Sequence, residues 1–312
     1  SYDNGNDQTT YDGLKYALWN YGPQKRYFYS LQIDHSLNKK LADSAQFIFA
    51  YQDVFESRHV QTFDPNNESK RNDQYENVDV YSININLRKK ALHYGLEYYY
   101  NAVSSSAIET YNGRSRPDPQ TRYPNGGSSM SSIAGFATYS KNFTEKLRLN
   151  TGIRYTQNQL DAIFHSVPYV WELPYDNLSY KYSALTGNIS LALHPDDSWK
   201  IATIASTGFH APNIDDTGKL FYKGSILTIP NFNLEPEYAR TLELNITKNL
   251  NNRLLFNVNT YYTFIEDAIM RVNTNLDFQI NQDEFFTEVK TNENTGNAEI
   301  YGTTASASLR IA

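Results

Sequence analysis

The sequence predicts an all-β protein that crosses a membrane as a transmembrane antiparallel β-barrel. Three observations carry this prediction. Many segments alternate apolar and polar residues with a period of two, and the connections between them are alternately short and long. In addition, the chain contains no run of about 18 or more apolar residues, the length that a membrane helix needs. Because hydrocarbon offers the backbone no hydrogen-bond partner, a chain without such a helix crosses a bilayer only as a closed sheet.

The alternating pattern is clear in residues 77–88. Tyr81 and Ile83 share one face of this segment, whereas Ser82 and Asn84 share the other. The alternating runs are about 10 to 13 residues long, which exceeds the usual globular strand of about 5–6 residues and suits a tilted membrane strand. In chain order, the predicted strands are 24–36, 43–54, 77–88, 91–103, 132–143, 146–157, 183–194, 198–209, 237–248, 253–267 and 297–311.

The connections between these strands differ in length at the two ends. Short polar turns recur near 38–40, 89–90, 142–146, 195–197 and 249–252. Long polar loops lie near 55–76, 104–131, 158–182, 209–236 and 273–296. Short turns on one side and long loops on the other are typical of bacterial outer-membrane barrels, whose long loops are extracellular. We therefore expect residues 1–312 to form one partial outer-membrane barrel domain.

The number of predicted strands, eleven, is odd, whereas single-chain bacterial barrels have an even number. The last predicted strand also runs to the end of the chain. We therefore expect the chain to be part of a larger barrel.

The composition excludes several classes of protein. Lys and Arg number 28 and Asp and Glu number 34, so the net charge of −6 argues against a nucleic-acid binder. Cysteine is absent, which excludes a disulfide scaffold, cysteine zinc sites and a cysteine nucleophile. Tyrosine is frequent, with 26 residues, and aromatic side chains near strand ends are expected to form interfacial girdles. The expected girdle residues are Tyr98, Tyr99, Tyr100, Trp199, Phe209, Tyr238, Tyr261, Tyr262 and Phe264.

No enzymatic motif or metal motif is found. The six histidines lack the HExxH and i,i+2 spacings that bring imidazoles together, and no P-loop, dinucleotide-binding or G-x-S-x-G motif occurs. We expect neither an enzyme nor an intrinsic metal or cofactor. A soluble propeller would repeat four strands in about 40–45 residues, whereas two strands occupy about 50 residues here.

Two motifs border the fourth long loop. The loop opens with Phe209-His210-Ala211-Pro212-Asn213 and closes with Asn231-Phe232-Asn233-Leu234-Glu235-Pro236-Glu237. These motifs resemble the "F-R-A-P" and "N-P-N-L-x-P-E" boxes of TonB-dependent outer-membrane receptors. Residues 294–302 resemble the "N-x-G-x-A-x-I-x-G" start of a later barrel strand, and residues 123–127 resemble a loop exit of the same family. The Asn-, Tyr- and Lys-rich loops are similar to those of receptors from Bacteroidetes.

The resemblance implies a specific fold and function. The family's barrel has 22 strands and encloses an N-terminal plug domain, which is not recognised in this chain. Members lie in the bacterial outer membrane, in contact with lipid and lipopolysaccharide. They import scarce large ligands such as ferric siderophores, haem or cobalamin, with energy from the TonB-ExbB-ExbD complex, and a surface lipoprotein is a further candidate partner. Haem or a ferric siderophore would then be a transported ligand.

The motif residues also suggest where a ligand binds. Candidate ligand-binding residues are His210, Asn213, Tyr222, Asn231 and Asn233, and the family-motif residues are Phe209, Ala211, Pro212, Leu234, Pro236 and Glu237. His210 stands where the motif has Arg, and neutral imidazole is a good iron ligand. The alternative is that His210 is a polar residue at a strand end and that the boxes only shape the loop. A second hypothesis for the whole chain is a receptor-like barrel that serves as a structural or interaction subunit of an outer-membrane assembly.

Overall fold

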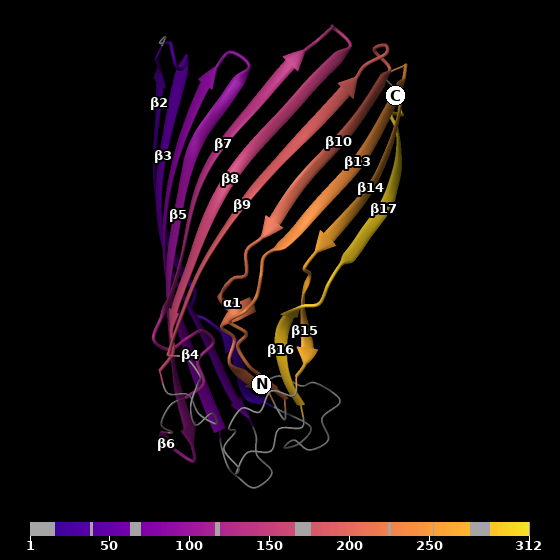
Figure 1. Cartoon of the computed structure of the whole chain (residues 1–312). Coiled ribbons are helices and arrows are strands. Elements are labelled where there is room, and N and C mark those ends of the chain that lie inside the picture. Colours follow the sequence, from indigo (N-terminus) through magenta and orange to yellow (C-terminus); the bar gives the residue numbers. More distant parts are fainter. Residues whose placement is uncertain are drawn as a thin grey trace.

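The computed structural model describes residues 16–37, 40–62, 70–115, 119–165, 176–223, 226–251, 253–274 and 288–311. These residues form one large antiparallel sheet of 13 strands and a second sheet of four short strands (Figure 1). Within this part of the chain, no helix has the length and apolarity needed to span a membrane. The all-β prediction is confirmed.

The large sheet follows the chain order along one continuous path. Its first strand is interrupted, since β1 (Tyr16–Tyr21) and β2 (Lys25–Ser36) pair with successive parts of β3 (Ser44–Thr62). The short β6 (Arg114–Ser115) only extends the end of β5. The remaining strands of the path are β4 (Lys70–Lys89), β5 (Leu92–Tyr111), β7 (Ser128–Asn142), β8 (Leu147–Ile163), β9 (Asn177–Leu193), β10 (Trp199–His210), β13 (Glu237–Leu250), β14 (Leu254–Glu266) and β17 (Ala298–Leu309). Every predicted strand therefore exists.

Several strands are longer than predicted, and the long connections are correspondingly shorter. The strands β4 and β5 have 20 residues each and stay paired from Lys89–Leu92 to Lys70–Tyr111. Their loop-side halves lie in the ranges 55–76 and 104–131, which were expected to be loops. Beyond the bilayer, both faces of a hairpin contact water, so its strands stay paired without alternating apolar and polar residues. The sequence therefore lacks the period of two by which a strand with one apolar face is recognised.

The sheet has an apolar face and a polar face. The apolar face carries exposed large side chains such as Leu96, Ile153 and Leu185, the last of which is 65% exposed. The polar face carries ion pairs such as Arg154 to Glu97, with a nitrogen–oxygen distance of 2.6 Å. This arrangement is the reverse of a soluble protein and is the one expected where lipid contacts the apolar face.

The aromatic residues of the apolar face form rows. Tyr29, Tyr51, Tyr81 and Tyr100 follow one another across β2 to β5, with ring centroids 4.9 to 6.3 Å apart. At the opposite end of the sheet, the Lys248 ammonium lies 4.3 Å from the centre of the Trp199 ring. Two expected girdle residues lie on the other face: Tyr99 pairs with Ser82, and Tyr261 pairs with Glu243. Neighbouring residues of a strand lie on opposite faces of the sheet, so consecutive tyrosines cannot all lie on the apolar face.

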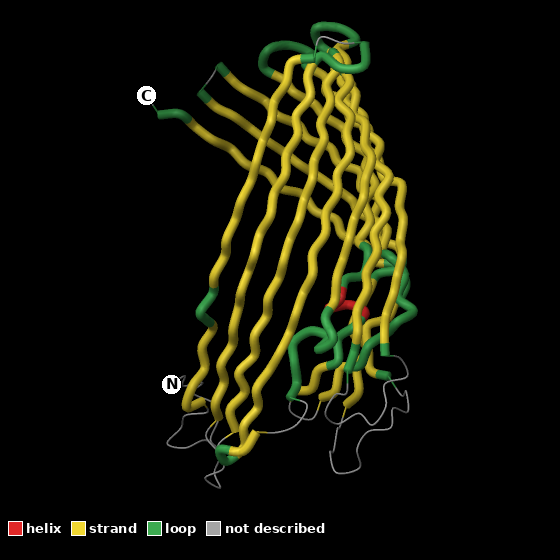
Figure 2. Tube along the Cα trace, turned by 90° about the vertical axis from the view of Figure 1, so that its left-hand side faces the viewer, coloured by secondary structure: helices red, strands yellow, loops and turns green. Residues whose placement is uncertain are grey.

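The sheet is curved and open between its first and last strands (Figure 2). Among the described residues, β1 and β2 pair only with β3, and β17 pairs only with β14. Short turns lie at one end of the sheet, here called the turn end, and the longer connections lie at the other, here called the loop end (Figure 1).

Two of the long connections contain regular structure of their own. The connection after β10 holds α1 (Ile214–Thr217), β11 (Phe221–Lys223) and β12 (Ile226–Thr228), and the connection after β14 holds β15 (Ile269–Asn273) and β16 (Glu288–Asn294). Parallel pairing of β12 with β16 joins the two connections into a four-stranded sheet. We call the described residues 211–223, 226–236, 268–274 and 288–297 the inner clasp.

Candidate functional site

The inner clasp lies against the polar face of the large sheet at the loop end. Leu160 and Ala162 continue the polar face of β8 and, with Phe164 and Leu178, form a buried cluster, against which Ile214 and Phe232 of the clasp pack. The Phe164 and Phe232 rings are 5.7 Å apart. The clasp thus covers an apolar part of the inner side of the wall.

The short helix of the clasp is held by Asn213. The Asn213 side-chain oxygen accepts hydrogen bonds from the backbone nitrogens of Asp215 and Asp216, at 2.7 and 3.2 Å. In return, the Asp216 carboxylate accepts one from the Asn213 nitrogen, at 3.0 Å. This reciprocal pattern is a capping box, which satisfies backbone donors at a helix start. The structure therefore gives Asn213, a predicted ligand residue, a capping role.

Asn231 joins three segments of the clasp. Its side-chain nitrogen donates to the Asn292 carbonyl oxygen at 2.8 Å, and its backbone nitrogen donates to the Thr217 carbonyl oxygen at 3.0 Å. Its side-chain oxygen accepts from the backbone nitrogen of Asn233 at 2.9 Å. Both polar atoms of this predicted ligand residue are therefore used within the clasp.

The family-motif residues fasten the clasp to the wall. Leu234 is 1% exposed, and its carbonyl oxygen accepts a hydrogen bond from the Tyr182 hydroxyl of β9 at 3.0 Å. The Glu237 carboxylate accepts from the backbone nitrogen of Ile269 at 2.6 Å and so ties β13 to β15. Ala211, Pro212 and Pro236 are buried alongside, whereas Phe209 stacks on Tyr238 on the apolar face, with ring centroids 6.3 Å apart.

His210 lies between two carboxylates at the point where β10 enters the clasp. Its Nδ1 is 2.9 Å from Glu237 Oε2, and its Nε2 is 3.5 Å from Asp216 Oδ2. Both ring nitrogens are therefore engaged. Iron coordination by His210 would require one of these contacts to break.

The remaining two ligand candidates have different surroundings. Asn233 is exposed, and its side chain forms no hydrogen bond within the described parts of the chain. Tyr222 belongs to β11, but its side chain lies outside the described part of the structure. The structure thus places Asn213 and Asn231 inside the clasp, His210 at its edge and Asn233 at its surface.

Sequence patterns did not reveal a second cluster, which lies outside the membrane-spanning part of the strands. We call Glu56, Arg58, Glu76 and Arg122 the mouth cluster. The Arg58 guanidinium is 3.2 Å from the Glu56 carboxylate, and Arg122 is 3.9 Å from it. Glu76 is only 2% exposed, and this burial raises the pKa of its carboxyl group, against the opposing pull of Arg58. The four residues come from three separate segments of the chain, so no local sequence motif predicts that they form a cluster.

The mouth cluster is covered by the segment that precedes β7. The Gln74 side chain donates to the Gln120 carbonyl oxygen at 3.0 Å, and the Tyr123 nitrogen donates to the Ser105 hydroxyl at 3.3 Å. Burial raises the pKa of the Tyr123 hydroxyl, and the negative charge of Asp215 in α1 adds to this effect. The segment that covers the mouth cluster therefore lies near α1 of the clasp.

A serine, a histidine and an aspartate also line up on the other side of the sheet. His59 Nε2 is 3.1 Å from the Ser57 hydroxyl, and His59 Nδ1 is 2.6 Å from the Asp73 carboxylate. Ser57 is fully buried, and its hydroxyl donates to the Pro23 carbonyl oxygen at 3.3 Å, beside the interruption of the first strand. A substrate cannot reach a nucleophile in this position, so the trio has a structural role. No group of three or more His, Asp and Glu side chains placed to hold a metal is found in the described part of the chain.

The fold and its site define a class of protein: an outer-membrane β-barrel wall with structured connections folded against its polar face. The family model described as "TonB dependent receptor-like, beta-barrel" matches residues 1–311, and the chain belongs to this family. It is therefore a Gram-negative outer-membrane protein of a family of receptors rather than enzymes. No curated protein sequence matches it.

Solved structures of several receptors resemble this chain. The copper transporter OprC is 12% identical with a TM-score of 0.69, and the match covers 94% of this chain and 44% of OprC. The hemophore receptor HasR of Serratia marcescens, in complex with its hemophore HasA and heme, is 13% identical, with a TM-score of 0.55 and coverages of 91% and 52%. The ferric yersiniabactin uptake receptor FyuA of Yersinia pestis is 16% identical, with a TM-score of 0.56 and coverages of 93% and 40%. The chain thus spans about half the length of the structures it matches.

Proposed function

We propose that this chain forms wall strands of an outer-membrane receptor that imports a scarce large ligand into the periplasm in a TonB-dependent manner. The family match over residues 1–311 carries the proposal. A barrel wall with long strands, a polar inner face and connections folded inward suits a ligand passage rather than a closed structural cylinder. A plug domain would fill the barrel, and the TonB-ExbB-ExbD complex would move it.

The proposed ligand-capture region is the loop end, with the inner clasp and the mouth cluster as its parts in this chain. Asn233 is the sequence-predicted candidate that offers a free polar side chain among the described residues. Asn213 and Asn231 act through the shape of the clasp, because their polar groups are already bonded. His210 would contribute an imidazole only after release from Glu237 or Asp216.

The ligand is proposed as a class, an iron chelate, haem, cobalamin or a similar scarce complex. The similar structures are those of a copper transporter, a hemophore receptor in complex with its hemophore and heme, and a ferric yersiniabactin uptake receptor. A surface lipoprotein and lipopolysaccharide are proposed as partners of the intact receptor.

The experiment is uptake by cells that express the full-length protein, with haem, cobalamin, copper and a panel of ferric siderophores as probes. We expect uptake of one probe class that stops when TonB is deleted, together with binding that survives the deletion. If no probe is bound or imported, and the protein instead copurifies in fixed stoichiometry with another outer-membrane protein, the transport proposal fails and an assembly subunit takes its place.

A further inference from the structure

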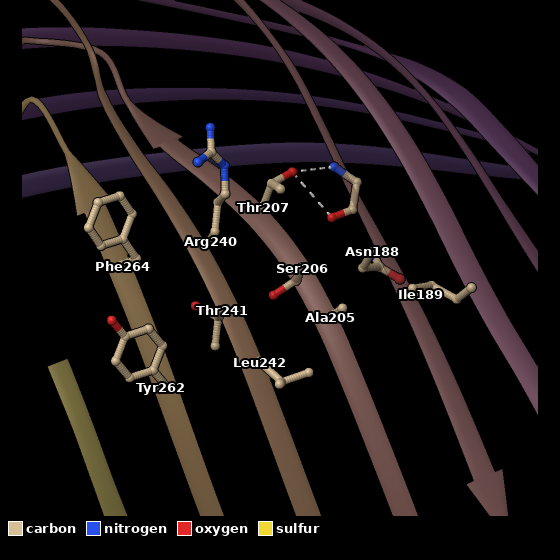
Figure 3. Close-up of a pocket in the computed structure, with 11 residues that line it drawn as sticks. Asn188, Ile189, Ala205, Ser206, Thr207, Arg240, Thr241, Leu242, Tyr262 and Phe264 are labelled. Atoms are coloured by element: carbon tan, nitrogen blue, oxygen red, sulfur yellow. Dashed lines mark hydrogen bonds between the residues drawn. The ribbon is translucent and has the colours of Figure 1, made fainter. Parts of the chain in front are cut away.

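The last residues of β10, which lead into the inner clasp, are paired with the wall on one side. In the described part of the chain, β10 pairs with β13 as far as His210, whereas its ladder with β9 ends at Ser206. Beyond that ladder, the Thr207 hydroxyl oxygen accepts a hydrogen bond from the Gly187 backbone nitrogen of β9 at 2.9 Å (Figure 3). Side-chain contacts at the end of β10 therefore contribute to the attachment of the clasp.

His210, the last residue of β10, joins the wall to the clasp through two carboxylates. Its Nδ1 is 2.9 Å from Oε2 of Glu237, the first residue of β13, and its Nε2 is 3.5 Å from Oδ2 of Asp216 in α1. The Glu237 carboxylate also accepts a hydrogen bond from the Ile269 nitrogen of β15. The Asp216 carboxylate also accepts one from the Asn213 nitrogen in the capping box of α1. One imidazole therefore connects β10 with β13, α1 and, through Glu237, β15.

The charge of this imidazole determines whether both contacts are favourable. An ionised carboxylate only accepts hydrogen bonds, and a neutral imidazole has one N–H group and one nitrogen lone pair. A neutral His210 therefore donates to one carboxylate and turns its lone pair toward the other. Protonation supplies the second N–H group and places a positive charge between two negative ones. Histidine is the side chain that changes its charge in this way between about pH 5 and pH 8.

Glu237 and Asp216 depend on His210 for a cation. Within the described residues, no other cationic side chain lies at ion-pair distance from either carboxylate. The cations of the neighbouring elements at the loop end have partners of their own: Lys219 with Asp215 at 3.4 Å, Arg240 with Glu266 at 2.8 Å, and Arg271 with the Asn292 side-chain oxygen at 3.3 Å. The His210 side chain is 48% exposed, so solvent reaches the ring and can exchange its proton.

We propose that protonation of His210 latches α1 of the inner clasp to the wall. At mildly acidic pH, the imidazolium holds Glu237 and Asp216 together. As pH rises, the neutral ring keeps the shorter contact, with Glu237, and turns its lone pair toward Asp216, so α1 loosens while β15 stays attached. The inference rests on the proposed function only in assigning the clasp to ligand capture, where the latch makes the capture region respond to external pH.

The test is amide hydrogen exchange of the full-length protein in detergent at about pH 5.5 and about pH 8, with rates corrected for the intrinsic pH dependence of exchange. No ligand is added, so the result is independent of whether the protein transports one. We expect residues 214–218 to be protected about fivefold more strongly at the lower pH, because water screens part of a charge-assisted hydrogen bond to a half-exposed ring. Residues 177–193 of β9, which lie in the wall, should be protected equally at both values.

Three variants make the test specific to His210. His210→Arg carries a charge at both pH values, so residues 214–218 should stay protected at the higher pH. His210→Gln carries none, so protection there should be low at both values. His194→Gln removes a histidine from the short turn between β9 and β10 and should behave as the unmodified protein does.

Two results would overturn the latch. One is equal protection of residues 214–218 at both pH values in the unmodified protein. The other is a pH dependence that persists in His210→Gln, which would assign the effect to another titrating group, such as the buried Glu76.

Discussion

Asn213 and Asn233 lie in the same connection and carry the same amide group, but their surroundings differ. The Asn213 oxygen caps α1 by accepting two backbone hydrogen bonds, whereas Asn233 projects from the clasp surface. Both were candidate ligand residues because they belong to the two motifs that border this connection. Only the three-dimensional contacts separate the residue that holds the loop from the residue that is free to bind.

The first prediction concerns this pair. Asn213→Ala removes the helix cap, which usually costs about 1 kcal/mol, so amide hydrogen exchange of residues 214–218 should become about fivefold faster. Asn233→Ala is the control and should leave exchange there unchanged. Identical exchange in both variants would show that the capping box contributes nothing to the clasp.

The second prediction concerns Glu76, which lies outside the membrane-spanning part of β4. Because burial raises its pKa in the folded state, the folded protein holds this proton more tightly than the unfolded chain does. The stability contribution is therefore complete below the unfolded pKa and is lost as pH rises toward the folded value. Glu76→Gln should unfold at a higher temperature than the unmodified protein at pH 8, with the difference shrinking toward pH 4.

The control for Glu76 is its cross-strand neighbour Glu56. Glu56 lies 3.2 Å from Arg58, so Glu56→Gln removes an ion-pair partner and should not raise the unfolding temperature at pH 8. A Glu76→Gln variant whose advantage grows as pH falls would contradict the assigned burial effect.

At the scale of elements, the strands of the large sheet can be predicted from the alternation of apolar and polar residues, whereas the elements of the clasp cannot. The apolar face of β4, with Tyr81 and Ile83, shows the period of two because lipid selects one face. The loop-side half of β4 lacks that selection, so its pairing with β5 as far as Tyr111 was missed. The parallel pairing of β12 with β16 joins segments about 60 residues apart, and a strand as short as the three residues of β12 shows no periodicity.

The motif boxes border the connection that folds into part of the clasp, but the contacts of their residues were beyond a sequence-based prediction. Leu234 and Glu237 were recognised as motif residues, while their partners Tyr182 and Ile269 lie in other elements. The mouth cluster was missed for the same reason, since Arg122 reaches Glu56 from a distant segment. Long-range contacts of this kind leave no local spacing to detect.

The third prediction belongs to the clasp as an element. Phe232 packs on Phe164 and the cluster around Leu160, and Phe232→Ala should cost about 2 kcal/mol, less than a fully buried phenylalanine because Phe232 is partly exposed. Proteolysis within residues 226–236 should accelerate, while the barrel keeps its folded mobility on unheated gels. Loss of the barrel band as well would show that the clasp and the wall unfold together.

At the scale of the whole molecule, one surface faces lipid and the other faces an aqueous or protein-filled interior. On β9, this division separates neighbouring residues: Ile189 is 50% exposed on the apolar face, and Ser190 follows on the polar face. Family membership agrees with this division. The same division places the clasp on the side of the proposed passage.

The fourth prediction tests this division directly. Ile189 lies in the middle of the apolar run from Leu185 to Leu193, so Ile189→Arg places a charge near the bilayer midplane. Such a charge costs about 2–4 kcal/mol on the lipid face of a barrel. Ser190→Arg introduces the same side chain one residue later, toward the polar side, where it remains hydrated. We expect folding into phospholipid vesicles, measured by gel mobility of the full-length protein, to fall at least tenfold for Ile189→Arg and to change little for Ser190→Arg. Equal losses in the two variants would contradict the assignment of the faces, and with it the passage proposed for the polar side.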